Sequence, residues 1–293
     1  MDQTPRPLAA FAFMLAGILS FTLMAVAGRE LAGHHDTFEI MFYRSLLGIG
    51  IVLAVGGLAG SLGQINTGQI RLHGLRNVFH FTGQNLWFFA VGLIPLGQLF
   101  ALEFTTPLWV ALLAPLVLGE RWRLTRGVAA VVGFAGILMV ARPDTIVLSP
   151  GVVAAILSAF GFAGTMLVTK ILSRRDGVTC ILFWLVVFQS GFGLVTAGID
   201  GDIAAPTAAS LPWLAVVGCT GLFAHWCITN ALKRAPASIV SPMEFLRLPA
   251  MAVTGYLLYA EPLEPAVFLG ATMVLGANLL NIAVEQRRQN APG

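Results

Sequence analysis

Long apolar stretches alternate with short polar segments along the whole chain. An α-helix needs about 20 apolar residues to cross roughly 30 Å of hydrocarbon, and the stretches have about that length. The two-residue alternation of a transmembrane β-strand does not occur in the sequence. The pattern therefore predicts an all-α integral membrane protein with ten transmembrane helices. The predicted helices cover residues 8–28, 38–58, 72–92, 95–118, 125–141, 150–171, 178–199, 210–232, 236–259 and 264–284.

Composition agrees with a bilayer as the solvent. Of the 293 residues, 57% are hydrophobic and 11% are charged, and the mean hydropathy is +0.83. A soluble domain carries about 25% charged residues, so this chain has too few charges to cover a soluble globule. The net charge is only +3, and we expect no nucleic-acid partner. The first stretch alternatively reads as a signal peptide cleaved after Ala25-Val26-Ala27, but the repeat described below requires it as a helix.

Basic residues concentrate on one side of the predicted membrane protein. That side holds both termini and the even-numbered connections, with 13 of the 17 Lys and Arg residues. The opposite side holds Arg29 and Arg142. Cytoplasmic loops carry an excess of Lys and Arg, so both termini are predicted to be cytoplasmic. The 13 residues are Arg6, Arg71, Arg76, Arg121, Arg123, Arg126, Lys170, Arg174, Arg175, Lys233, Arg234, Arg287 and Arg288.

The chain matches itself when it is shifted by 141 residues. The match predicts a first five-helix repeat at 1–141, a second at 142–284 and a cytoplasmic tail at 285–293. Because five is odd, the second repeat must enter the membrane from the opposite side. Inverted repeats of this kind are typical of secondary transporters, although fold alone does not fix function. The most informative pairs are Pro95/Pro236, Glu103/Glu244, Phe104/Phe245 and Glu120/Glu261.

Three short motifs resemble a known family. Leu118-Gly119-Glu120, the glycines at 127, 133 and 136, and the segment at 231–238 look like the EamA-type domain of the drug/metabolite transporter superfamily. The second half departs from the pattern, with Tyr259-Ala260-Glu261 in place of Leu-Gly-Glu. The chain is also similar to bacterial exporters of amino acids, including aromatic ones.

The resemblance implies a secondary transporter that exports small metabolites by alternating access, with amino acids or related amphipathic compounds as first candidates. Cationic drugs, nucleotides or vitamins are the alternative cargo. A membrane receptor or enzyme is a more distant alternative. The partners expected are a small-molecule substrate and the lipid bilayer. A monomer has enough helices for a complete pathway, and a dimer stays open.

Polar residues at membrane depth are the candidates for substrate binding, because a central charge costs about 2.5 to 3.5 kcal/mol. One face of the third predicted helix carries Asn77, His80, Gln84 and Trp87. The 141-residue offset places His225 opposite Gln84. These side chains either line a central cavity or join helices by hydrogen bonds.

Charged residues and prolines suggest coupling and gating. Glu103 and Glu244 are equivalent in the repeat, and either could carry a proton. Arg247 follows Glu244 by three residues, which predicts either a structural ion pair or a site where Arg247 binds a substrate carboxylate. Arg44 could reach Glu103 across helices. Pro107 and Pro249 predict kinks that either gate transport or are static.

No cofactor or catalytic motif is found in the sequence, and no metal site is predicted. There is no phosphate-binding loop of the nucleotide-triphosphatase type and no zinc-protease motif. Cys180, Cys219 and Cys227 lack metal-ligand spacing and are predicted to be reduced and buried.

Overall fold

The structure is a computed structural model. It describes residues 7–118, 127–128, 131–132, 134–136, 148–172, 175–199, 203–234, 247–263, 265–270, 272–273, 276 and 280. Within these residues all regular structure is helical, and the only β feature is an isolated bridge between Ala32 and His35. The prediction of an all-α protein is therefore confirmed for the described part of the chain.

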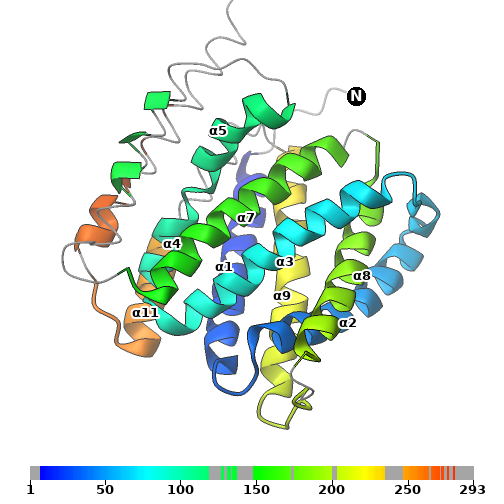
Figure 1. Ribbon diagram of the computed structural model, residues 1–293, viewed down its shortest axis with the longest axis horizontal. Helices are drawn as coiled ribbons and strands as arrows, with labels where there is room; N and C mark the ends of the chain where they lie inside the picture. The colour runs from blue at the N-terminus through cyan, green and yellow to red at the C-terminus, as the bar shows by residue number, and fades with distance from the viewer. Residues whose placement is uncertain are drawn as a thin grey trace, which may run out of the picture.

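Nine α-helices and one short 3-10 helix have described bounds (Figure 1). Four α-helices are long and apolar enough to cross a membrane, namely α1, α2, α7 and α8. Predicted helices 125–141 and 264–284 lie largely outside the described residues, as does the first part of 236–259. The elements are α1 (Pro7–Leu31), α2 (Thr37–Leu58), η1 (Leu62–Gln64), α3 (Ile70–Leu93), α4 (Leu96–Glu103), α5 (Thr106–Leu118), α7 (Pro150–Leu172), α8 (Val178–Ala197), α9 (Leu211–Arg234) and α11 (Arg247–Tyr259).

The predicted helix 95–118 is wrong as a single element, because the chain breaks it into α4 and α5. Pro107 has no N–H group and cannot bond to the carbonyl of Glu103, four residues earlier. The Thr105 N–H and hydroxyl instead both donate to the carbonyl of Leu102, at 3.1 and 2.7 Å. The sequence suggested a kink at this proline, and the structure has two separate helices that meet near Thr105.

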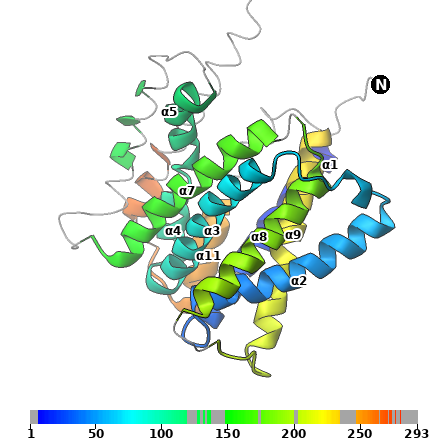
Figure 2. The same cartoon turned by 45° about the vertical axis from the view of Figure 1, so that its right-hand side comes forward.

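The most extensive packing joins helices from different halves of the chain. α1 packs on α9, α2 on α8 and α3 on α7, as Figures 1 and 2 show. The smaller contacts of α5 with α7 and of α11 with α1 follow the same pattern. Each contact is converted into its counterpart when the 141-residue offset is applied.

Polar side chains lie inside the bundle and large apolar side chains lie outside. Asn77 and Gln84 of α3 are buried, whereas Leu58, Leu194 and Leu257 are exposed on the outer faces of three other helices. The interior also contains many apolar side chains, but so many large apolar side chains on the outside suit helices surrounded by lipid. The chain is therefore a multi-pass membrane protein whose polar chemistry faces inward.

Candidate functional site

An ion pair across the two halves forms the centre of the bundle. The guanidinium of Arg247, at the start of α11, contacts the carboxylate of Glu103 at the end of α4. Trp87 of α3 donates its indole N–H to the same carboxylate at 2.9 Å. Glu103 thus has a cationic partner that the sequence did not identify, because Arg247 was expected to pair with Glu244.

Aromatic rings enclose the Arg247 guanidinium. Its central carbon lies 4.9 Å from the ring centroids of Phe21 and Phe100, and 5.6 Å from that of Phe104. Such cation–π contacts stabilise a cation that is withdrawn from water. The Nε atom of Arg247 is buried and has no hydrogen-bond partner among the described residues. One strong donor at this centre is therefore available to a ligand.

A second guanidinium lies in the other part of the interior. Arg44 of α2 donates to the Gln84 side-chain oxygen on α3 at 2.5 Å. The sequence left open whether Arg44 reaches Glu103, and in the structure it contacts Gln84 instead. A small cavity beside it is lined by Arg44, Ser45 and Gln189, with Gly218 and Gly221 of α9 opposite.

Gln189 of α8 is a polar residue of this interior that the sequence analysis missed. It is only 2% exposed, and its side-chain nitrogen has no hydrogen-bond partner within the described part of the chain. The sequence could have identified it, because a glutamine in the middle of an apolar helix usually faces the protein interior. Its counterpart in the repeat is Gly48, which lines the same cavity.

The two guanidinium groups flank the same surfaces of α1 and α3. Gln84 and Trp87 are three residues apart on α3, which is about one helical turn. The Met24 sulfur of α1 lies beside Gly221 near Arg44, and Phe21, three residues earlier, stacks on Arg247. One track therefore joins the two cations, with the polar side chains of Gln84 and Trp87 on α3 and the apolar side chains of Phe21 and Met24 on α1.

The track lies near the middle of the predicted membrane. Glu103 is seven residues from the start of α4, and Arg44 is seven residues from the start of α2. At 1.5 Å per residue, each is about 10 Å along its helix. Arg247 is twelve residues from the end of α11, or about 18 Å.

The other predicted substrate ligands fall into three groups. His80 is buried, and its ring packs edge-on against Phe162 at a centroid distance of 6.2 Å. Asn77 donates to the backbone carbonyls of His73 and Trp184, so it joins α3 to α8 rather than facing a cavity. The side chain of His225 lies outside the described residues, although its backbone belongs to α9.

The remaining predicted positions concern Glu244 and the two prolines. Glu244 lies outside the described residues. Pro107 is the second residue of α5 and Pro249 the third of α11, positions in the first helical turn where proline costs no hydrogen bond within its own helix. Both prolines therefore stand at helix starts near the central ion pair.

A polar network at one end of the bundle joins the α1–α2 turn to the segment before α9. We call it the His35 cluster, and it consists of His35, Glu39 and Ser210 with the backbone of Ala204. His35 contacts Glu39 at 3.0 Å and Ser210 at 2.9 Å, one with each ring nitrogen. Glu39 also accepts hydrogen bonds from the Ala204 N–H at 2.5 Å and the Asp36 N–H at 3.1 Å.

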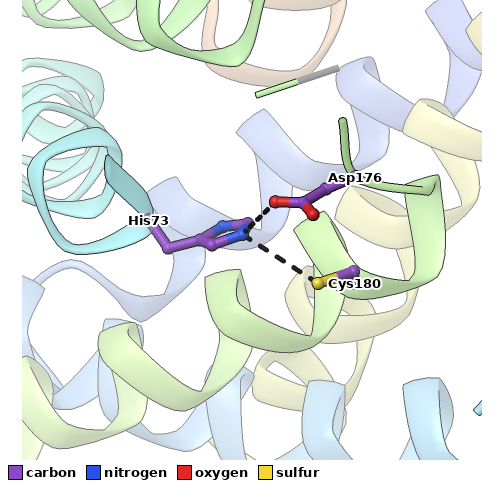
Figure 3. Close-up of side chains that lie close together, drawn as sticks. All are labelled: His73, Asp176 and Cys180. Atoms are coloured by element: carbon purple, nitrogen blue, oxygen red, sulfur yellow. Dashed lines mark hydrogen bonds and ion pairs between the residues drawn. The ribbon is translucent and has the colours of Figure 1, made fainter. Parts of the chain in front are cut away.

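A second polar network lies at the opposite end of α2 and α8. We call it the His73 cluster, and it consists of His73, Asp176, Cys180 and Asn66. His73 Nε2 lies 2.9 Å from the Asp176 carboxylate and 3.9 Å from the Cys180 sulfur, as Figure 3 shows. Asn66 donates to the other Asp176 oxygen at 3.2 Å. Cys180 is buried as expected, whereas Cys219 is exposed, so the prediction of three buried thiols is wrong for Cys219.

The described part of the chain is a helical bundle built from two related halves, and comparison with known proteins gives its family. A model of the EamA-like transporter family matches residues 8–142 and again 149–283. The chain belongs to this family and carries two copies of its repeat. It is therefore a transporter rather than an enzyme.

Individual relatives agree with this family. The chain is 30% identical to a riboflavin transporter of Rhizobium johnstonii, over 75% of this chain and 72% of the relative. It is 24% identical to an S-adenosylmethionine uptake transporter of Rickettsia prowazekii, over 99% and 98%. It is also 26% identical to a riboflavin transporter of Vibrio cholerae, over 94% and 93%. A crystal structure with 18% identity covers 96% of this chain and 99% of its own, with a TM-score of 0.64, which supports the same fold.

Proposed function

We propose that this transporter moves amphipathic metabolites bearing a carboxylate across a bacterial inner membrane, with amino acids and amino-acid conjugates as first candidates. The observation that carries the proposal is the Arg247 guanidinium, which lies among aromatic rings and whose buried Nε has no partner among the described residues. A carboxylate binds such a group by parallel hydrogen bonds. The aromatic side chains supply the apolar wall that accepts the rest of the substrate.

The substrate carboxylate competes with Glu103 for Arg247 in this mechanism. Without substrate, the Glu103 carboxylate neutralises the guanidinium. With substrate bound, Glu103 keeps the Trp87 indole as its donor. Binding therefore loosens the contact between α4 and α11, which come from different halves of the chain. Alternating access requires a substrate-dependent change of this kind between the repeats.

The inverted ten-helix topology, with both termini in the cytoplasm, is part of this proposal. The exchange of packing partners between the halves supports the inversion. The break between α4 and α5 also fits, because transporters of this architecture bind substrate where helices are discontinuous.

A vitamin of the flavin type is the second candidate substrate. Two of the relatives are named as riboflavin transporters. A flavin has no carboxylate, so its ring carbonyls would accept from Arg247 and from Arg44 or Gln189. Its planar ring would stack on the same phenylalanines. The sequence suggested export, whereas the Rickettsia relative is named for uptake, so the assay must measure both directions.

Counterflow in liposomes tests the proposal directly. Purified protein is reconstituted, and radiolabelled aromatic amino acids, S-adenosylmethionine and riboflavin are offered in turn, with and without a pH gradient. We expect saturable exchange of a carboxylate-bearing substrate in both directions. Exchange of riboflavin alone would favour the second candidate. A requirement for the gradient would show proton coupling and make Glu103 the first candidate for the coupling residue.

Variants of the central ion pair identify the residues responsible. Arg247→Ala should abolish exchange, whereas the control Arg71→Ala, at an exposed position of α3, should leave it unchanged. Glu103→Gln removes the competing charge and keeps an acceptor for Trp87. We expect it to bind a carboxylate substrate about tenfold more tightly, which is about 1.4 kcal/mol. Normal exchange by well-folded Arg247→Ala would disprove this binding site.

A further inference from the structure

We propose that the His73 cluster is a binding site for a thiophilic divalent cation of the zinc class, held between the two halves of the protein. Three side chains that ligate metals meet in a buried position: an imidazole from α3, a thiol from α8 and a carboxylate from the turn before α8. Their ligand atoms all lie within 4.8 Å of one another. The spacing of the three residues in sequence gave no sign of this, because the fold brings His73 to residues more than 100 positions away.

The distances between donor atoms are close to those of a tetrahedral site. Zinc bonds of about 2.0 Å to nitrogen and oxygen and 2.3 Å to sulfur place N and O about 3.3 Å apart, and N and S about 3.6 Å apart. In the structure His73 Nε2 lies 2.9 Å from Asp176 and 3.9 Å from Cys180. Shifts of a few tenths of an ångström, within reach of side-chain rotation, bring these two distances to the coordinated values, and the third pair, Asp176 and Cys180, lies within 4.8 Å. Figure 3 shows both partners approaching the same ring nitrogen.

That shared nitrogen distinguishes a metal site from a catalytic triad. A cysteine nucleophile needs a histidine that contacts the thiol with one nitrogen and the carboxylate with the other. Here Asp176 and Cys180 both approach Nε2, while Nδ1 is buried without a partner among the described residues. The imidazole cannot relay a proton between them. A cation shared by the three groups uses the observed arrangement directly.

Asn66 completes the site and gives access to it. Its amide nitrogen lies 3.2 Å from Asp176 and 3.8 Å from Cys180, and its backbone oxygen lies 3.7 Å from the sulfur. The residue itself is exposed, so a cation can enter beside it. An asparagine oxygen or a water molecule then supplies the fourth ligand. Coordination replaces the thiol proton, which is released to solvent.

A cation at this position would hold the two halves together. His73 belongs to the first half of the chain, and Asp176 and Cys180 belong to the second. All three lie at one end of the α2–α8 and α3–α7 contacts. If that end must open during transport, the cation blocks opening without occupying the substrate site. Slower exchange on addition of cation is thus a second consequence, which rests on the proposed function.

Direct binding of Cd²⁺ and Zn²⁺ to the purified full-length protein tests the site without any transport assay. We expect one Cd²⁺ per chain, together with the ultraviolet charge-transfer band of a cadmium–thiolate bond. Cys180→Ser should remove the band. His73→Gln should weaken binding by more than the roughly 10- to 100-fold that loss of an outer-sphere partner costs. The matched control Cys219→Ser, which removes an exposed thiol, should bind as the wild type does.

A measurement on the unmodified chain guards against variants that fail to fold. Zn²⁺ should slow the alkylation of Cys180 by a maleimide, measured by mass spectrometry, and leave Cys219 reactive. A chelator should restore the rate. Absence of stoichiometric Cd²⁺ binding, or unaltered reactivity of Cys180 in the presence of Zn²⁺, would overturn the site. Binding that does not slow exchange would instead count against opening at this end, leaving the metal site in place.

Discussion

The His35 cluster and the His73 cluster occupy equivalent places in the two halves but differ in chemistry. The 141-residue offset relates His35 to Asp176, Glu39 to Cys180 and Tyr43 to Trp184. The two clusters lie at opposite ends of α2, whose 22 residues span about 33 Å. They are therefore separated by roughly the thickness of the hydrocarbon core.

Beside each cluster lies the same kind of contact, which we call the outermost contact: an aromatic side chain donates to a backbone carbonyl of the other half. Tyr43 donates its hydroxyl to the Ala204 carbonyl at 2.9 Å, and Trp184 donates its indole N–H to the Asn66 carbonyl at 2.8 Å. Each ties a helix to the connection from the other half of the chain. The repeat has kept this contact while changing the residues inside the cluster.

The inner contacts show the difference. In the His35 cluster both ring nitrogens and both Glu39 oxygens have partners at 3.1 Å or less. In the His73 cluster the sulfur contacts are 3.7 to 3.9 Å long, and one ring nitrogen is unpaired within the described residues. Equivalent positions thus form two different clusters. In the His35 cluster the imidazole and the carboxylate are fully hydrogen-bonded, whereas the His73 cluster has longer contacts and contains a thiol.

Removing the two carboxylates provides the largest test of this comparison. Glu39→Ala leaves His35 and two backbone N–H groups without an acceptor, so we expect a loss of about 3 kcal/mol in the free energy of unfolding. Asp176→Ala leaves fewer donors unpaired and should cost about 1.5 kcal/mol. Thermal unfolding in detergent measures both. His34→Ala, at an exposed position beside the His35 cluster, is the control, and an equal or larger loss for Asp176→Ala would contradict the comparison.

Moving the thiol from the His73 cluster to the His35 cluster should have an effect of intermediate size, on the affinity for Cd²⁺. Ser210→Cys, made together with Cys180→Ser, places sulfur beside His35, where the hydroxyl now lies at 2.9 Å. We expect Cd²⁺ to bind there about tenfold more weakly than at the His73 cluster, because both Glu39 oxygens are already engaged. The cadmium–thiolate band measures the affinity. Equal affinity would mean that the hydrogen bonds already made by the Glu39 carboxylate do not affect the binding of Cd²⁺.

The outermost contacts should give the smallest effects, and nearly equal ones. Tyr43→Phe removes one hydrogen bond and should cost about 1 kcal/mol in the free energy of unfolding. Trp184→Phe should cost about the same, with a small further loss of packing. Distant sites normally add, so the double variant should show the sum. A departure larger than about 0.5 kcal/mol would show that the two ends are energetically coupled, against the expectation for independent clusters.

The helices were largely predictable from the sequence because apolar length reports membrane crossing directly. The predicted helices 38–58 and 150–171 differ from α2 and α7 by one residue at one end. The break between α4 and α5 was not predicted, because a proline in an apolar stretch signals either a kink or an end. The bonds from Thr105 to the Leu102 carbonyl, which end α4, are not reported by apolar length.

The candidate site was only partly predictable, because sequence spacing reports neighbours on one helix and not partners across helices. The three-residue spacing of Glu244 and Arg247 suggested a local ion pair, yet Arg247 contacts Glu103 from the other half. The polarity of α3 correctly drew attention to Gln84 and Trp87 as interior residues. Gln189 and the His73 cluster gain their meaning from residues more than 100 positions away.

The exchange of packing partners between the halves has a consequence for synthesis of the protein. α1, α2 and α3 each make their largest contacts with a helix of the second half. When the ribosome has completed only the first half, these helices lack the surfaces that bury Arg44, Asn77 and Glu103. Until the second half is inserted, the polar side chains of the first half are therefore in contact with lipid or with insertion factors. Assembly of this protein therefore ends with a single docking step, rather than with two repeats that fold in turn.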